Sequence, residues 1–72
     1  MGVTQMQVIY NDKTDLLYIR FDAGKHEVTN QRVADNIVLD VAENNRIIGI
    51  EIMDASKSVN LGQLLPIDYK AA

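Results

Sequence analysis

Apolar and polar residues alternate with a period of two along most of the chain, which is typical of β-strands that bury one face. The alternation predicts strands at residues 5–10, 16–21, 37–41 and 47–53. A further segment, residues 27–33, is polar and keeps no single alternation, so it predicts a weak edge strand with a bulge. A sheet built from these strands has one apolar face, which requires a cover.

Short polar residues separate the predicted strands and indicate turns. Residues 11–15 and 42–46 favour hairpin loops, because Asn and Asp side chains hydrogen-bond to nearby backbone groups and tolerate left-handed conformations. Asn45 is the residue expected in the left-handed region of the second loop. Between the second and third strands, residues 22–25 indicate a further turn, because Gly24 can adopt positive φ at little cost.

The periodicity becomes helical toward the C-terminus. Leu61, Leu64 and Leu65 recur at helical spacing, and Asn60 precedes them as a candidate N-cap. The pattern predicts helical turns over residues 55–65, whose leucines are the intramolecular candidate for covering the sheet.

The expected fold class is therefore α+β. It consists of one domain over residues 1–72, an antiparallel β-meander of four to five strands with a short C-terminal helix and a frayed tail at 67–72. A length of 72 residues limits the domain to one small core that needs reinforcement. The chain has no cysteine and one histidine, His26, so disulfides and thiolate or histidine-rich metal sites are excluded. Self-association is the form of reinforcement that remains, so we expect a homo-oligomer or a complex with a small partner protein.

Charge and hydropathy narrow the possible partners. The formal net charge of −3 disfavours binding to a phosphate backbone, so no nucleic acid is expected. No segment approaches the ~20 consecutive apolar residues of a membrane span, and the N-terminus lacks a basic stretch followed by an apolar run. We therefore expect a cytoplasmic protein with no membrane contact.

The motifs that most often carry chemistry are weak in this chain. Residues 11–15 resemble a calcium loop only superficially, because Lys13 stands where a ligand oxygen is required. His26 has no evident carboxylate to orient it and is expected to be solvent-exposed. Ser56 and Ser58 lack the glycines of a nucleophile elbow, so capping is their expected role. We predict no catalytic residue, no metal site and no cofactor.

One polar cluster is expected on the sheet face opposite the apolar stripes. Tyr18, Arg20, Asp40 and Glu51 all alternate onto that face, and the apolar Ile47 shares it. The cluster is either a ligand or partner patch, with Arg20 binding a carboxylate, or a solvated face with cross-strand ion pairs.

Apolar residues on the same predicted face favour an interface. Leu16, Val38 and Met53 alternate onto it together with the polar cluster, and an exposed apolar patch usually marks an interaction surface. Gly49 lies inside the strongest strand and indicates a close approach, either by Tyr18 from a neighbouring strand or by the backbone of a partner.

Two stretches resemble a known family. They are YNDKTDLLYI at residues 10–19, and IVLD at 37–40 running through RIIGIEIMDAS at 46–56. Together they resemble the YuzE-like family of small prokaryotic proteins, a domain-of-unknown-function family. The family pattern usually has Asp at Asn11 and Gly at Asn36 and Asn45; the first departure removes a carboxylate from the turn, and Asn replaces Gly well where φ is positive.

The resemblance implies a compact α+β domain with an antiparallel meander and brings no established activity. Some members are thought to be encoded beside small toxin-like proteins, which implies antitoxin-like binding partners. We therefore expect a non-catalytic protein-interaction module that self-associates or binds a partner protein. The alternative is a small-molecule-binding protein or enzyme that uses Arg20, Asp40 and Glu51 on the outer sheet face.

Overall fold

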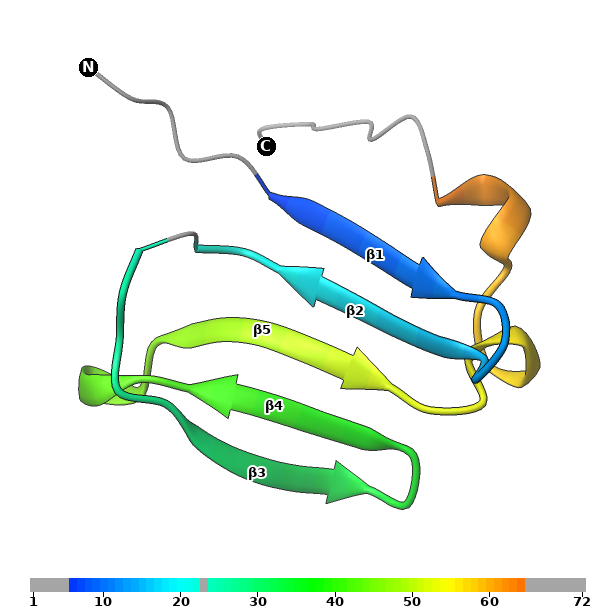
Figure 1. The fold of residues 1–72 in the computed structure, drawn as a ribbon. Helices are drawn as coiled ribbons and strands as arrows, with labels where there is room; N and C mark the ends of the chain where they lie inside the picture. Colours follow the sequence, from blue (N-terminus) through cyan, green and yellow to red (C-terminus); the bar gives the residue numbers. More distant parts are fainter. Residues whose placement is uncertain (1–5, 23, 65–72) are drawn as a thin grey trace, which may run out of the picture.

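A computed structural model describes residues 6–22 and 24–64, which form a single antiparallel sheet of five strands (Figure 1). Three short 3₁₀ turns complete the described chain. In sequence order, the elements are β1 (Gln7–Asn11), β2 (Leu16–Arg20), β3 (Thr29–Ala34), β4 (Ile37–Val41), η1 (Glu43–Asn45), β5 (Ile47–Ile52), η2 (Ala55–Lys57) and η3 (Leu61–Gln63).

The strand order across the sheet is β1-β2-β5-β4-β3. β1 and β2 form a hairpin, and β3, β4 and β5 form a meander of two consecutive hairpins. The two parts join where β2 pairs with β5. The chain between β2 and β3 therefore crosses one end of the sheet to reach its far edge (Figure 1).

The polar third strand pairs within the chain as an edge strand. β3 is antiparallel to β4, and all six of its residues are exposed. The register shifts between Arg32 and Ala34, so the irregularity indicated by the polar sequence is a real break in the ladder. A second shift lies between β4 and β5, where Asp40 pairs with Gly49 but Val41 pairs with Ile47.

The core lies on one face of the sheet, which we call the inner face. Leu17 from β2, Ile52 from β5 and Ala55 from η2 are its buried centre. Partly buried residues pack around them from the other strands and from the C-terminal turns: Val8, Ile19, Ile37, Ile50, Val59, Leu61 and Leu64. Leu61 and Leu64 thus cover the apolar face as expected, whereas Leu65 lies outside the described residues.

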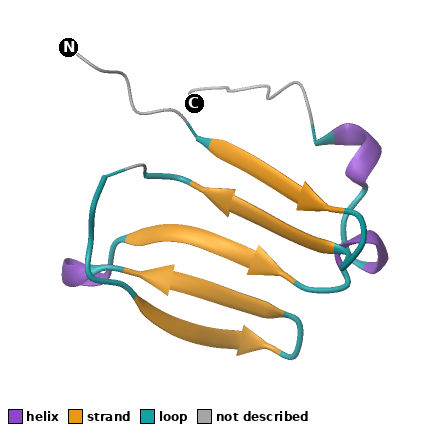
Figure 2. Cartoon of the chain, viewed as in Figure 1, coloured by secondary structure: helices purple, strands orange, loops and turns teal. Residues whose placement is uncertain are grey.

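The expected α+β class with a C-terminal helix is wrong. Within residues 6–22 and 24–64 the helical segments are only 3₁₀ turns of three residues each (Figure 2). Serine, asparagine and glycine occupy every second position from Ser56 to Gly62, and such residues disfavour a helix interior. Isolated helices of this length are also marginal. The fold is therefore an antiparallel β-sheet with 3₁₀ turns, and the predicted tail at 67–72 lies outside the described residues.

Side chains rather than glycines shape the turns. Asn11 Oδ1 accepts hydrogen bonds from the backbone N–H of Lys13 at 3.0 Å and of Thr14 at 3.4 Å, as predicted for the first hairpin. Asn45 adopts the expected positive φ of 58°. Gly24 does not use the positive φ that a glycine allows, because none of the described glycines has one; instead, Asp22 Oδ1 accepts the Gly24 N–H at 2.8 Å.

Candidate interaction site on the outer face of the sheet

Two rows of side chains cross the face opposite the core, and we call them the outer-face rows. Their members follow from the strand registers, because directly paired residues of an antiparallel ladder point to the same face. The first row comprises Ile9, Tyr18, Glu51, Val38 and Arg32. The second row comprises Gln7, Arg20, Gly49, Asp40 and Asn30.

The structure brings four of the five predicted site residues together in these rows. Tyr18 pairs with Glu51, and Arg20 and Asp40 flank Gly49 from opposite sides. Ile47 is set apart, because the register shift places it opposite Val41 at the start of β5, where its side chain is about half exposed.

Sequence reasoning missed the outer members of both rows. Ile9 and Gln7 come from β1, and Arg32 and Asn30 from β3. Alternation shows which residues of one strand share a face, but it does not say which strands are neighbours. The pairing of β2 with β5, on which both rows depend, joins segments far apart in sequence.

Tyr18 is held in place at the centre of the first row. Its hydroxyl donates a hydrogen bond to Asp40 Oδ2 at 2.7 Å, and this bond spans β5 at Gly49. A Cβ atom at position 49 would lie only 2.6 Å from Tyr18 Oη, so the glycine creates the space for the contact. Partial burial, followed by the hydrogen bond to Asp40, raises the pKa of Tyr18 above its usual value. The tyrosine is therefore a neutral donor fixed against a carboxylate.

The Arg20 side chain hydrogen-bonds to the loop that follows its own strand. Its Nε donates to the carbonyl oxygen of Asp22 at 2.7 Å, and its Nη2 donates to the carbonyl oxygen of Gly24 at 3.0 Å. These two bonds use much of the donor fork with which a guanidinium binds a carboxylate. Arg20 is thus a loop anchor, which weakens the interpretation that it binds an acidic ligand.

A second polar cluster, which sequence reasoning missed, joins the first hairpin to η2. Asp15 has a positive φ of 55°. Its Oδ1 accepts the Tyr10 hydroxyl at 2.6 Å and the Ser56 N–H at 3.0 Å, and its Oδ2 accepts the Ser56 hydroxyl at 2.6 Å. The backbone of Ala55 also donates to the carbonyl oxygen of Asp15 at 2.9 Å. We call this group the Asp15 clamp.

The Asp15 clamp is built to hold a charge rather than to transfer a proton. The hydrogen bond from the Ser56 hydroxyl, and then that from Tyr10, lowers the pKa of Asp15. The same contact with Asp15 raises the pKa of Tyr10. Ser56 therefore donates its hydroxyl hydrogen to a carboxylate. The expectation that Ser56 caps a helical turn is wrong, because Asp54 occupies the N-cap position of η2. The two stretches that resemble the family contain all three residues of the clamp: Tyr10 and Asp15 lie in the first stretch, and Ser56 lies in the second.

His26 has two carboxylates beside it, so the expectation of an unoriented, solvent-exposed histidine is wrong. Nε2 lies 3.1 Å from Asp22 Oδ2 and Nδ1 lies 3.3 Å from Glu43 Oε1, and the side chain is 18% exposed. These contacts tie the β2–β3 connection to η1. The backbone N–H of Gly24, and then His26, lowers the pKa of Asp22. Within the described residues, no group of three metal-ligating side chains is arranged to hold a metal ion.

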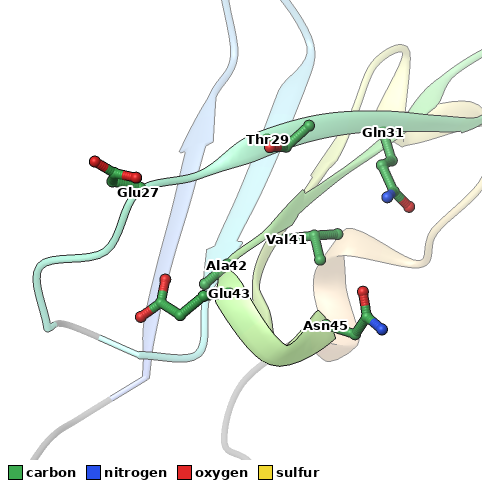
Figure 3. Close-up of a pocket in the computed structure, with 7 residues that line it drawn as sticks. All are labelled: Glu27, Thr29, Gln31, Val41, Ala42, Glu43 and Asn45. Atoms are coloured by element: carbon green, nitrogen blue, oxygen red, sulfur yellow. The ribbon is translucent and has the colours of Figure 1, made fainter.

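An open hollow of about 290 Å³ lies beside this contact, between β3, β4 and η1 (Figure 3). It is lined by Glu27, Thr29, Gln31, Val41, Ala42, Glu43 and Asn45. Thr29 pairs with Val41, which alternates onto the inner face, so the hollow lies away from the outer-face rows. The carboxylate of Glu43 already contacts His26.

These features define a small antiparallel β-sheet protein whose clustered polar side chains anchor turns, loops and one another. No helix among the described residues is long and apolar enough to cross a membrane. A family model, Protein of unknown function (DUF2283), matches residues 7–56, which is more than half of the chain. The chain therefore belongs to that family.

The family match is consistent with the resemblance read from the two strings, since it covers both of them. It does not itself confirm the YuzE-like name, and its description assigns no activity. Neither the curated proteins nor the solved structures gave a match to the chain.

Proposed function

We propose that this protein is a non-catalytic interaction module that binds a partner protein through its outer-face rows. The observation that carries the proposal is the position of Tyr18. It lies at the middle of a sheet face that η2 and η3 do not cover, because those turns pack on the inner face. Tyrosine is among the residues that contribute most to binding energy at protein interfaces. Its bond to Asp40 fixes the ring before binding, which lowers the entropic cost of association.

The composition of the outer-face rows supports a protein partner. Ile9 is 54% exposed beside Tyr18, and Val38 contributes a second, half-buried apolar side chain. Glu51 and Arg32 place opposite charges in the same row. Apolar and aromatic area mixed with a few charges is the usual make-up of a non-obligate protein interface. Binding a toxin-like protein, as the family resemblance implies for some members, would be one case of this function.

The alternative of a small-molecule site or an enzyme centred on Arg20, Asp40 and Glu51 has less support. Two donor groups of Arg20 bind the backbone of the following loop, and Asp40 accepts the hydroxyl of Tyr18. A ligand would have to replace these contacts before it could use the side chains. A protein surface gains from the same contacts, because they hold the face rigid.

A tagged capture from the native host tests the proposal. The full chain should recover a partner in a fixed stoichiometry, and Tyr18→Ala and Glu51→Lys should each reduce its recovery at least about tenfold, the loss expected when an interface anchor is removed. Tyr18→Ala removes the anchor, and Glu51→Lys reverses a charge beside it.

Glu27→Lys is the matched control, because it reverses the charge of an exposed glutamate on the loop before β3, away from the outer-face rows. Circular dichroism verifies that each variant is folded. Recovery that falls with both outer-face variants and survives in Glu27→Lys supports the proposal. Recovery that is the same in all variants contradicts it, as does the recovery of no partner.

A further inference from the structure

The two edges of the sheet differ in how well they are protected against pairing with another strand. At one edge, β3 carries a register shift and the charged Arg32, both of which hinder the addition of a strand. At the other edge, β1 keeps an unbroken register with β2 over five residue pairs. Its sequence, QVIYN, contains no charge, proline or glycine. Among the residues that the structure describes, β1 is therefore a regular strand edge without the usual protective features.

We propose that β1 pairs antiparallel with β1 of a second copy, across a two-fold axis centred on Ile9. In this register Ile9 faces Ile9 of the second copy, Val8 faces Tyr10, and Gln7 faces Asn11. Val8 with Tyr10 is a β-branched with aromatic pair, which is favourable across an antiparallel ladder. Ile9 with Ile9 is apolar with apolar, and the amides of Gln7 and Asn11 have donors and acceptors for each other. The strand is thus complementary to itself in shape and polarity.

Charge favours the antiparallel arrangement as well. Each copy has a formal net charge of −3, so pairing must not bring acidic groups together. The acidic turn that follows β1 holds Asp12 and Asp15. In the proposed register these turns lie at opposite ends of the shared ladder, and Asp12 of one copy faces Met6 of the other.

The core provides a reason for the chain to pair. Among the described residues, six hydrophobic side chains are buried, and two of those are alanines. Domains of this size seldom gain enough stability from one core alone. Pairing would satisfy the outward backbone groups of β1 and join two sheets into one of ten strands. It would also reduce the exposure of Ile9 and Tyr10, which are now 54% and 38% exposed.

Light scattering on the purified full chain tests the pairing. The wild-type mass should be about twice the 8.1 kDa of one chain. Ile9→Lys places two positive charges at the two-fold axis and should give a monomer. Val33→Lys is the matched control, because Val33 is a β-branched residue at the other edge with nearly the same exposure, 55%; it should remain a dimer. A mixture of Ile9→Lys and Ile9→Glu should restore the dimer.

Single cysteines test the register, because the chain has none of its own. Ile9→Cys should cross-link two copies under mild oxidation, since the two thiols face each other. Gln7→Cys should not, since it faces Asn11 of the second copy. Circular dichroism again verifies folding.

The inference is overturned if the wild type is a monomer. This holds equally if another segment of the chain, or another protein, is found to cover β1. It is also overturned if Ile9→Lys stays dimeric, if Val33→Lys is equally disruptive, or if Gln7→Cys cross-links as readily as Ile9→Cys. The inference does not rest on the proposed function. A chain that dimerises in this way and captures no partner protein would support the inference and contradict the proposed function.

Discussion

Gly49 is the residue on which the contact between Tyr18 and Asp40 depends. A methyl group at this position would lie 2.6 Å from Tyr18 Oη and 3.0 Å from the carbonyl oxygen of Ile19, and the backbone atom has little freedom to move. We expect Gly49→Ala to lower the free energy of unfolding by about 1–3 kcal/mol, the usual cost of overpacking. Urea unfolding measures the change.

Gly62→Ala is the control for that substitution, because the nearest atom to its new methyl group, Asn60 Oδ1, is 3.5 Å away. This variant should unfold at nearly the wild-type urea concentration. Equal stability of Gly49→Ala and wild type would show that β2 and β5 move apart without cost, and that the Tyr18 contact is not tightly packed.

Single residues were predictable where local chemistry decides their role. A glycine in the middle of a strong strand indicates a close approach, and the side chain that approaches Gly49 is Tyr18, as expected. Asn45 likewise has its expected positive φ. The contact of His26 with Glu43 was not predictable, because Glu43 reaches it only after the chain has crossed the sheet. The contact with Asp22 is local, four residues away, and was overlooked. At Gly24 the positive φ that a glycine allows is not used, because the Asp22 side chain forms the turn instead.

At the scale of elements, the Asp15 clamp connects the first hairpin to η2, and its stability should depend on pH. The pKa of Asp15 is lowered in the folded protein by the Ser56 hydroxyl and then by Tyr10. The clamp therefore stabilises the fold fully above the pKa of Asp15 in the unfolded chain. Its contribution is lost as the pH falls through the lower pKa of the folded state.

Thermal unfolding between about pH 7 and about pH 3, a range that includes the ordinary pKa of aspartate, measures this loss. We expect Asp15→Asn to lower the melting temperature at neutral pH and to lose less stability than wild type on acidification. Asp12→Asn removes a charge from the same turn but none of the contacts to Tyr10 and Ser56, so it should follow the wild-type curve. Parallel pH curves for wild type and Asp15→Asn would contradict the clamp.

The strands were predictable as elements because a sheet with one buried face requires apolar and polar residues to alternate along each strand. The C-terminal turns were not, because leucines at helical spacing suit an α-helix and a pair of 3₁₀ turns equally well over so short a segment. The backbone instead closes mostly i to i+3 hydrogen bonds, as from Lys57 N to the carbonyl oxygen of Asp54 at 3.0 Å. Asn60 is the exception, since its side chain caps η3 as expected.

At the scale of the whole molecule, the order of the strands could not be read from the sequence. Hairpins such as β1–β2 follow from short loops, but the pairing of β2 with β5 depends on the path of the chain across the end of the sheet. The candidate site shares this limit. Tyr18, Arg20, Asp40 and Glu51 were assigned to one face by alternation, whereas the contact between Tyr18 and Asp40 requires β5 to lie between their strands.

A single sheet covered on one face by short turns has a thin core, so its stability should depend on very few side chains. Leu17 and Ile48 are the largest fully buried ones among the described residues. Truncating a buried leucine to alanine costs about 2–5 kcal/mol, and a core of this size supplies about 3–5 kcal/mol in total.

We therefore expect Leu17→Ala to leave much of the chain unfolded at room temperature, as measured by circular dichroism and urea titration at one fixed protein concentration. Val33→Ala removes a comparable apolar group from a position that is 55% exposed, and it should change stability by less than about 0.5 kcal/mol. A fully folded Leu17→Ala variant would mean that the sheet draws its stability from outside this core. Pairing at the β1 edge would then be the first source to examine, because Ile9→Lys combined with Leu17→Ala should unfold the chain.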